Sequence, residues 1–382
     1  MNFMSALLIC SVVLLIPPVL TAAWNAARWR VDVNSRRNFN QSVSVLVPCR
    51  DEERNIESCI KSVFEQIDEV ESIFLYDDES TDNTSEILKK IAKANPKKVT
   101  IVPTVHKPAG WTGKNHACFQ LAANAKSDWL LFLDADARLK PDAISKMREI
   151  AAKKRVSFLS AWPELLVSSI AEKLLMPILN HIVFTLFPAP LADSKNDESL
   201  GLAHGACIFM DRNIYLELGG HETVRNELFE DTMLARLWRR SGHKSACTDG
   251  IGIVAVRMYD SFSSIIKGFT KNYYPAFKKR RSFWIFQLWS LTAWTVIPIG
   301  WTVALLFGEG GVLSLAPILL SISPRVILAA RMRHPIWSTI FNPVTNLIAL
   351  YIGTLSFINW TFNRGVDWKG RHYSGTESTD NV

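Results

Sequence analysis

The sequence predicts an α/β domain with a mostly parallel, doubly wound sheet, together with transmembrane helices at both ends of the chain. Three observations lead to this prediction. Residues 1–27 and 335–363 carry no charge, and Glu309 is the one charged residue between Ser282 and Pro324. Between these ends, short apolar runs alternate with stretches of helical spacing. Acidic residues directly follow three of those runs, at the edge where parallel sheets bind their ligands.

Composition excludes several classes of protein. The 382 residues carry a formal charge of +7, and 48% are hydrophobic. Apolar stretches longer than the roughly 20 residues that cross a bilayer argue against a wholly soluble or a disordered protein. The six cysteines form no C-x-x-C pair and the histidines no H-E-x-x-H motif, so neither a disulfide framework nor a zinc site is expected. The positive charge suits membrane lipids or an anionic substrate, and no nucleic-acid-binding motif occurs.

Residues 1–27 form the predicted N-terminal transmembrane anchor. The segment lacks the basic start of a secretory signal. Four arginines follow it instead: Arg28, Arg30, Arg36 and Arg37. Because cytoplasmic flanks carry the excess of basic residues, the catalytic domain, at 40–260, is predicted to face the cytoplasm.

A C-terminal transmembrane region is predicted over residues 283–360, after a basic boundary at 278–281. It divides into apolar segments at 283–307, 311–331 and 336–360. Three complete crossings would place the basic residues of the polar tail, 361–382, outside, against the positive-inside rule. We therefore expect one segment to be re-entrant or interfacial, and the polar residues of the last one favour it: Asn342, Pro343 and Asn346.

The domain at 40–260 alternates strand and helix signals. The expected strands are 43–47, 72–76, 99–102 and 129–133, and the expected helices are 53–66, 84–91, 115–125 and 232–240. The strand at 129–133 has no polar residue, as expected for a strand buried on both faces. Such β–α repeats give a parallel sheet with its ligand at the carboxyl ends of the strands.

Acidic pairs follow three of these strands. They are Asp51 and Glu52, Asp77 and Asp78, and Asp134 and Asp136. Clustered carboxylates repel one another, and burying them without partners is costly. A hard divalent cation, Mg²⁺ or Mn²⁺, relieves this repulsion and typically shares its coordination with substrate phosphates. The implied ligand is a nucleotide that contains a diphosphate. For Asp51, Glu52 and Asp82, capping of a helix N-terminus is the competing explanation.

An ordered set of motifs carries a family resemblance. It comprises residues 43–53, 76–82, 134–136 and 230–231, with the loop 108–115 and the closing residues 368–373. The set resembles the family 2 glycosyltransferases, in a membrane-bound branch similar to carotenoid- and hopanoid-associated enzymes and, more distantly, to ceramide glucosyltransferase. The resemblance implies a GT-A fold, a nucleotide-sugar donor, a divalent metal and inversion at the anomeric carbon.

Carried over residue by residue, the resemblance assigns a donor site and a metal ligand. The predicted nucleotide-binding residues are Pro48, Asp51, Glu52, Asp77, Asp78, Lys114 and Asp134, and Asp136 is the predicted metal ligand. The residues themselves agree for Lys114, because Gly110 and Gly113 permit close backbone approach and an ammonium suits phosphate. A surface turn with a solvated lysine is the alternative.

Asp231 is the predicted catalytic base. Inverting transfer needs one carboxylate to take the proton of the acceptor hydroxyl, and no second carboxylate as a nucleophile. The alternative is that Glu230 and Asp231 merely begin a helix, where acids favour the dipole. Glu230, His204 and Gly205 resemble the acceptor side of the family's site, although His204 could equally be a buried core histidine.

The chain lacks the Gln-x-x-Arg-Trp motif that processive synthases of this family carry after the base. Residues 267–272 stand at that distance instead, so we expect one sugar per acceptor. Lys271 is either a cation for the diphosphate or part of a basic interfacial segment at 261–281. A second apolar but proline-interrupted stretch, 168–190, also suits the bilayer surface, with packing in the domain core as the alternative.

The sequence thus predicts a membrane-anchored inverting hexosyltransferase that uses a nucleotide-sugar, a UDP-hexose, and a lipid acceptor. Three alternatives stay open at this point: a metal-dependent nucleotidyl- or phosphotransferase, a processive polysaccharide synthase, and a membrane protein with a decayed transferase domain. The sequence sets neither the sugar nor the oligomeric state.

Overall fold

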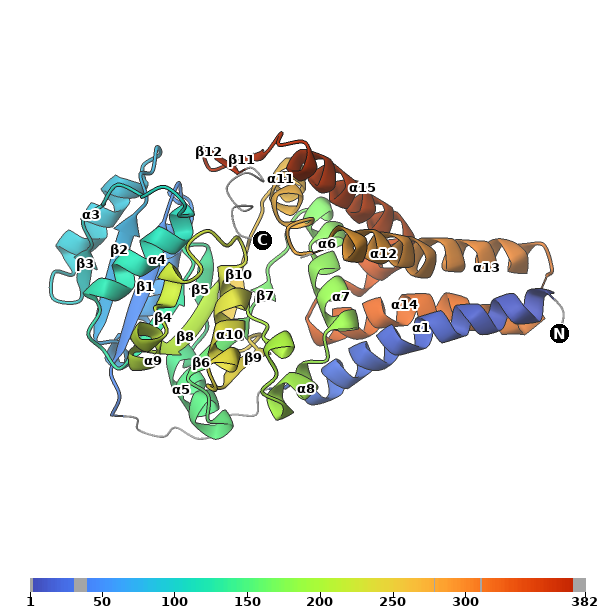
Figure 1. Cartoon of the computed structure of the whole chain (residues 1–382), viewed down its shortest axis with the longest axis horizontal. Helices are drawn as coiled ribbons and strands as arrows, with labels where there is room; N and C mark the ends of the chain where they lie inside the picture. Colours follow the sequence, from blue (N-terminus) through green and yellow to red (C-terminus); the bar gives the residue numbers. More distant parts are fainter. Residues whose placement is uncertain (1–2, 31–39, 278, 310, 374–382) are drawn as a thin grey trace. The chain divides into compact units, whose positions relative to one another are not determined.

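A computed structural model describes residues 3–30, 40–277, 279–309 and 311–373 and divides into two units. The sheet unit comprises Arg30–Leu166 and Leu191–Met258, and the helical unit comprises Met1–Trp29, Val167–Pro190 and Tyr259–Val382. Both are coloured along the chain in Figure 1. Arg36, Arg37 and Lys278 of the predicted basic flanks, and residues 374–382 of the predicted tail, lie outside the described residues.

The sheet unit is built around a seven-stranded sheet in the order β3-β2-β1-β4-β8-β6-β9 (Figure 1). Its strands are β1 (Val43–Cys49), β2 (Ser72–Asp77), β3 (Val99–Ile101), β4 (Trp129–Leu133), β6 (Phe158–Trp162), β8 (Cys207–Asp211) and β9 (Ser245–Asp249). Neighbouring strands are parallel except at β8, which is antiparallel to both β4 and β6. The mostly parallel sheet confirms the predicted fold class, and the reversed strand is a feature that the sequence pattern did not predict.

Helices cover both faces of this sheet. The α-helices of this unit include α2 (Ile56–Phe64), α3 (Thr84–Ala94), α4 (Gly113–Asn124), α5 (Ala143–Lys154), α9 (Arg212–Glu217) and α10 (Glu230–Arg240). Short 3-10 turns are η1 (Ile67–Glu69), η2 (Glu198–Leu200) and η3 (Gly220–Glu222). Because side chains alternate along a strand, Val45 of β1 packs in the core that contains α2, whereas Leu46 packs in the core with Leu121 of α4 and Trp238 of α10. A small sheet joins β5 (Ala137–Leu139), β10 (Val254–Val256) and β7 (Glu164–Leu165).

The helix predicted to begin at residue 53 begins at Ile56 instead. The backbone of Asp51 is left-handed, with φ of 51°. The main-chain N–H of Glu53 donates to Asp82 Oδ2 at 3.0 Å. The residues before α2 are therefore held by the loop after β2, which delays the first helical turn.

The helical unit contains four helices, among the described residues, that are long and apolar enough to cross a membrane: Phe3–Arg28, Arg280–Leu306, Gly311–Arg331 and Ile336–Thr361. The first is α1 (Phe3–Arg28), and the second joins α12 (Arg280–Leu291), a π-helical turn (Thr292–Val296) and α13 (Ile297–Leu306). The third joins η5 (Gly311–Ser314) and α14 (Leu315–Arg331), and the fourth joins η6 (Ile336–Phe341) and α15 (Asn342–Thr361). Two prolines inside α1 are tolerated, and Thr21 Oγ1 donates to the Pro17 carbonyl at 3.0 Å.

The segment predicted to lie at the bilayer surface forms two short helices in the helical unit. α6 (Ile170–Leu175) begins with a capping box between Ser169 and Glu172, and α7 (Pro177–Leu186) begins at a proline. Asn25 of α1 ends α7, because its Nδ2 donates to the carbonyls of Phe184 and Phe187, each at 2.8 Å. A further helix, α8 (Ala189–Ser194), contains the boundary between the units.

The helical unit also holds the end of the described chain. α11 (Phe262–Asn272) lies in the predicted basic segment, and a hairpin of β11 (Val366–Trp368) and β12 (Arg371–Tyr373) lies in the predicted polar tail. The tail is therefore structured as far as Tyr373.

Candidate active site

The loops after β1 and β2 are joined through their acidic residues. Asp51 Oδ1 accepts hydrogen bonds from the main-chain N–H of Thr81 at 2.7 Å and from its Oγ1 at 3.2 Å. The N–H of Asp51 donates in turn to Ser80 Oγ at 3.1 Å. Asp51 thus fixes the shape of the two strand-end loops. Its partner Thr81 precedes α3, which begins at Thr84, so this contact is not a helix cap.

Three more of the predicted nucleotide-binding residues, Glu52, Asp77 and Asp78, lie at the same two strand ends. Asp77 accepts a hydrogen bond from the N–H of Ser80 at 3.0 Å and another from Ser85 Oγ, so its carboxylate orders the start of α3. Glu52 is buried and accepts from Asn55 Nδ2 at 2.8 Å. Asp78 is also buried, and its N–H donates to the carbonyl of Cys49, at the end of β1.

Pro48 lies within β1, in register with Tyr76 of β2. Its lack of an N–H is compatible with this position near the strand end, where the chain is about to turn. Pro48, Asp51, Glu52, Asp77 and Asp78 therefore come from two adjacent strands and their loops, which confirms that they share one edge of the sheet.

Lys114 connects two of the acidic motifs. Its ammonium lies 2.8 Å from Asp134 Oδ1 and 3.0 Å from Glu230 Oε1. Asp134 comes from the end of β4, Glu230 begins α10, and Lys114 lies in the first turn of α4. Burial opposes the charge of Lys114, but the two carboxylates outweigh it and raise the pKa of the ammonium well above its ordinary value. Lys114 is therefore a cation held by two carboxylates, with its side chain 36% exposed.

Gly205 makes room for this cluster. A Cβ atom at Gly205 would lie 2.8 Å from Lys114 Nζ, 3.3 Å from Glu230 Oε1 and 3.4 Å from Asp231 Oδ2. The backbone of residue 205 is thus the surface against which three charged side chains lie. The predicted acceptor-side glycine and the predicted base are brought together with the predicted donor lysine.

Asp231 occupies the first turn of α10, and the N–H of Thr232 donates to its Oδ1 at 2.6 Å. Burial and the neighbouring carboxylate of Glu230 raise the pKa of Asp231 to about 7, although Lys114 opposes the shift. A carboxyl group with a pKa near neutrality can take and release a proton at physiological pH.

Asn115 of α4 holds the loop 224–227, which precedes α10. Its Nδ2 donates to the carbonyls of Val224 at 2.6 Å, Glu227 at 3.0 Å and Arg225 at 3.2 Å. The N–H of Thr112 also donates to the Arg225 carbonyl, at 2.7 Å. Because Asn115 follows Lys114 directly, these bonds align the lysine with Glu230. Sequence reasoning missed this role, for which the asparagine carries no local signal.

His204 is a buried histidine held by β6. Its N–H donates to Ser160 Oγ at 2.8 Å, and that hydroxyl donates back to the His204 carbonyl at 3.1 Å. The imidazole packs edge-on against Trp162, with ring centres 5.0 Å apart. Burial lowers the pKa of His204 to about 4, so the ring is neutral at physiological pH. Ser160 and Trp162, which position this loop, were not predicted.

The donor set at the end of β4 suits a hard divalent ion shared with a substrate. Asp134 is paired with Lys114, and Asp136 lies two residues further along the turn. The described residues contain no group of three or more histidine, cysteine, aspartate or glutamate side chains that could hold a metal by themselves. A carboxylate that supplies only part of the coordination fits Mg²⁺ or Mn²⁺ completed by phosphate oxygens and water, and does not fit a closed structural zinc site.

Lys271 belongs to the helical unit. Its ammonium lies 4.4 Å from the centre of the Tyr373 ring and 5.8 Å from that of Trp368. The C-terminal hairpin thus presents aromatic faces to this cation. Its predicted role toward the diphosphate stays a prediction.

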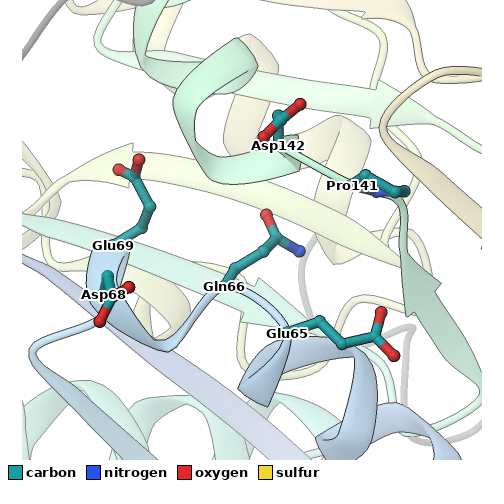
Figure 2. A pocket seen from close by; sticks show the side chains of 6 residues that line it. All are labelled: Glu65, Gln66, Asp68, Glu69, Pro141 and Asp142. Carbon is teal, nitrogen blue, oxygen red and sulfur yellow. The ribbon is translucent and has the colours of Figure 1, made fainter.

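A separate acidic cavity lies elsewhere in the sheet unit. It has a volume of about 370 Å³ and is lined by Glu65, Gln66, Asp68, Glu69, Pro141 and Asp142 (Figure 2). Gln66 Oε1 accepts from the N–H of Ile144, and Arg148 pairs with Glu69 at 2.6 Å. No predicted site residue lines this cavity, which lies between the end of α2 and the start of α5.

Comparison with known proteins accounts for these motifs. Residues 44–219 match the model of a family described as Glycosyl transferase family 2. A 4,4'-diaponeurosporenoate glycosyltransferase of Staphylococcus haemolyticus is 31% identical over 236 residues, which are 61% of this chain and 61% of that protein. The protein of the same name from Staphylococcus aureus is 25% identical over 352 residues, which are 88% of this chain and 90% of that protein.

The same fold occurs in a solved structure. A mannosyltransferase from Pyrobaculum calidifontis, in complex with GDP-Man and Mn²⁺, superposes with a TM-score of 0.51 at 15% identity, over 94% of this chain and 98% of that chain. This likeness confirms the predicted architecture, and the family match confirms the resemblance for the motifs within residues 44–219. Residues 44–219 thus form a domain that matches Glycosyl transferase family 2, in a chain that shares the fold of this mannosyltransferase.

Proposed function

We propose that this protein transfers one hexose from a nucleotide-sugar, a UDP-hexose, to a lipid-type acceptor at a membrane surface, with inversion at the anomeric carbon. One observation carries the proposal. Lys114, Asp134, Glu230 and Asp231 come from three separate elements and converge at the carboxyl edge of the sheet. This edge is where α/β sheets bind their ligands.

The donor end of the site consists of the strand-end loops. Asp78 and Glu52 are buried beside the ends of β1 and β2, and hydroxyl groups of a ribose or polar atoms of a base are ligands that buried carboxylates can bind. Lys114 is a cation for the diphosphate, since a compact ammonium suits phosphate oxygens. A bound Mg²⁺ or Mn²⁺, held by Asp136, would neutralise the charge that develops on the leaving diphosphate.

Asp231 is the base for a hydroxyl acceptor. The acceptor oxygen forms its bond to the anomeric carbon while the bond from that carbon to the diphosphate breaks, and the hydroxyl proton passes to a carboxylate oxygen of Asp231. The pKa of about 7 leaves enough carboxylate at neutral pH and makes it a stronger base than an ordinary aspartate. Glu230 and Gly205 position Lys114 and Asp231 on the acceptor side.

The acceptor is proposed to be of the carotenoid type. Both staphylococcal relatives are named for 4,4'-diaponeurosporenoate, and that name denotes a carboxylate. Four helices of suitable length and hydropathy support anchoring in the membrane that holds such a lipid. Arg28 at the end of α1 and Arg30 just after it support a catalytic domain on the cytoplasmic face, by the positive-inside rule.

A carboxylate acceptor would change the task of Asp231. Such an acceptor carries no proton to remove, and an ionised Asp231 would repel it. In its neutral form, Asp231 could instead donate a hydrogen bond to the acceptor. The pKa of about 7 permits either role, and the pH profile separates them. Transfer to a hydroxyl group would increase as the pH rises through about 7, whereas transfer to a carboxylate would decrease.

The test is release of nucleoside diphosphate from a panel of nucleotide-sugars by the purified full chain with a native lipid extract. We expect release from one donor, dependent on Mg²⁺ or Mn²⁺, together with one sugar on the lipid product by mass spectrometry. Asp136→Ala is expected to abolish release, and Asp231→Asn to abolish transfer to a hydroxyl acceptor. Products with many sugars would indicate a processive synthase. Pyrophosphate from nucleoside triphosphates, with no reaction of any nucleotide-sugar, would refute the proposal.

A further inference from the structure

The last apolar helix packs against α12 in a defined direction. Near its start, Thr295 Oγ1 donates to the Pro343 carbonyl at 3.3 Å and Ser290 Oγ to Asn346 Oδ1 at 2.8 Å. Further along, Gln287 Nε2 donates to the Leu350 carbonyl at 3.1 Å, and the rings of Phe283 and Phe357 stack with centres 5.7 Å apart. Residue numbers increase along α15 while they decrease along α12. The two helices are therefore antiparallel (Figure 1).

The preceding helix, α14, also runs opposite to α12 and α13. It follows α13 after a short turn and packs against it, and its last residue, Arg331, donates from Nη2 to the Trp29 carbonyl at 2.9 Å. Trp29 directly follows α1. In α1, Ser11 pairs with Trp301 of α13 at 3.1 Å, and Leu15 packs with Trp294, so α1 is antiparallel to α12 and α13 as well.

α14 and α15 consequently run in the same direction. Two complete membrane crossings that follow each other along the chain must run in opposite directions. The connection between them, residues 332–341, includes the 3-10 turn η6, which advances only about 2.0 Å per residue. Such a connection is too short to return across a hydrocarbon core of about 30 Å. The two helices therefore are not both complete crossings.

We propose that α1, α12–α13 and α14 cross the membrane, and that residues 336–361 form a re-entrant segment that enters and leaves on the side where α12 begins. The C-terminal hairpin then lies on that side. The chain passes into the sheet unit directly after Trp29, beside the end of α14, so the hairpin and the catalytic domain face the same compartment. The turn near Glu309 faces the opposite compartment.

The polar groups at the inner end of α15 support a partial insertion. Asn342, Thr345 and Asn346 are buried, and Asn346 Nδ2 donates to the Ser290 carbonyl and to Thr295 Oγ1, each at 3.0 Å. Thr295 lies in the π-helical turn between α12 and α13, within the crossing helix. Backbone that begins a helix at membrane depth is tolerated where protein groups bind its polar atoms. Ser290 of α12 and Thr295 of the π-helical turn provide these groups.

This topology has a consequence for the basic residues of the tail. Trp360 Nε1 donates to the Lys271 carbonyl at 3.2 Å, so the end of α15 lies beside α11. Lys369 and Arg371 of the hairpin then share a side with Arg280, and the conflict between three C-terminal crossings and the positive-inside rule disappears. Lys271 and its aromatic partners also lie on the side of the catalytic domain.

Cysteine labelling of the full chain in sealed inverted membrane vesicles tests the proposal without requiring activity. The parent carries Cys10→Ser, because Cys10 is exposed and the other five cysteines are buried. Three single variants of exposed positions are compared: Lys90→Cys in the sheet unit, Glu309→Cys in the turn after α13, and Asp367→Cys in the hairpin. We expect a membrane-impermeant maleimide to label the cysteines at 90 and 367 in the same preparation, and the one at 309 only after permeabilisation.

The proposal would be overturned if the cysteines at 367 and 309 were labelled under the same condition and the cysteine at 90 under the other one. Joint labelling of 90 and 367 from the other face would change the orientation but leave the topology standing. A second measurement tests the register. The pair Ser290→Cys and Asn346→Cys should form a disulfide under mild oxidation, whereas the mismatched pair Phe283→Cys and Asn346→Cys should not. A disulfide in the mismatched pair alone would refute the antiparallel register.

Discussion

The ammonium of Lys114 lies 3.0 Å from Oε1 of Glu230, and this contact joins the first turn of α4 to the first turn of α10. The same ammonium contacts Asp134 at 2.8 Å, so one cation links three motifs that are far apart in the sequence. A lysine held in this way needs little reorganisation to meet a diphosphate, and preorganised charge is a large contributor to catalysis.

A Glu230→Gln variant is expected to shift the pH dependence of kcat/KM on its acid side, where activity rises with pH. With a hydroxyl acceptor, Asp231 acts as carboxylate, so kcat/KM increases as the pH rises through about 7 and is lost below it. Removing the negative charge of Glu230 removes one cause of the raised pKa, and the rise should move to lower pH. Glu222→Gln, an exposed position, is the control. A rise that stays in place or moves upward would contradict the assignment of Asp231.

Gly205→Ala is expected to reduce activity without unfolding the protein. The new methyl group would lie 2.8 Å from Lys114 Nζ and displace the lysine from its carboxylates. Displacement of a catalytic group by about 1 Å can cost on the order of 100-fold in rate. Gly252→Ala is the matched control, because a Cβ atom there meets nothing within 4 Å. Equal kcat/KM values for the two variants, at unchanged Tm, would show that the close approach at residue 205 is unimportant.

Asn115→Ala is expected to destabilise the fold. Asn115 is fully buried, and its loss removes three hydrogen bonds to the carbonyls of the 224–227 loop. Leaving buried carbonyls without donors costs about 1–3 kcal/mol of unfolding free energy. Thermal unfolding of the purified chain measures the loss, with Asn124→Ala, an exposed position on the same helix, as the control. A Tm equal to that of the control would contradict the role of Asn115.

Asp136→Ala is expected to remove metal-assisted nucleotide binding. In the parent, Mn²⁺ should tighten the binding of UDP, because the ion neutralises the diphosphate while Asp136 holds it. Calorimetric titration of UDP with and without Mn²⁺ reads this out independently of turnover. Asp68→Ala, in the acidic cavity, should behave as the parent. Loss of the Mn²⁺ effect in the Asp68 variant alone would move the metal site to that cavity.

Lys271→Ala is expected to weaken the binding of UDP about tenfold or more, since hydrogen bonds to charged groups contribute about 1.5–3 kcal/mol. Lys271→Arg should retain most of the affinity, because the charge is kept. Lys267→Ala, which removes an exposed lysine from the same helix, should have little effect. Unchanged affinity in Lys271→Ala would assign this lysine to the packing of Tyr373 and Trp368 only.

Much of the sheet could be predicted because its signals are local. The fully buried strand β4 consists of Trp129-Leu130-Leu131-Phe132-Leu133, an apolar run with no polar alternation. Carboxylates after such strands must meet at one edge of a parallel sheet, so the strand-end acids could be named without coordinates. The antiparallel strand β8 could not be predicted, because strand direction depends on pairing with distant partners and not on residue pattern.

The sequence by itself determined the apolar helices, the alternation of strands and helices, and the acidic residues at the strand ends, since each depends on the periodicity or identity of neighbouring residues. The tertiary structure decided which acidic residues order the loops and which hold Lys114. Asp51 joins the loops after β1 and β2 and Asp77 orders the loop that follows it, whereas Glu230 and Asp134 hold Lys114. It also decided the direction of α15. Both depend on contacts between residues that are far apart in the chain, and only the folded protein brings those residues together.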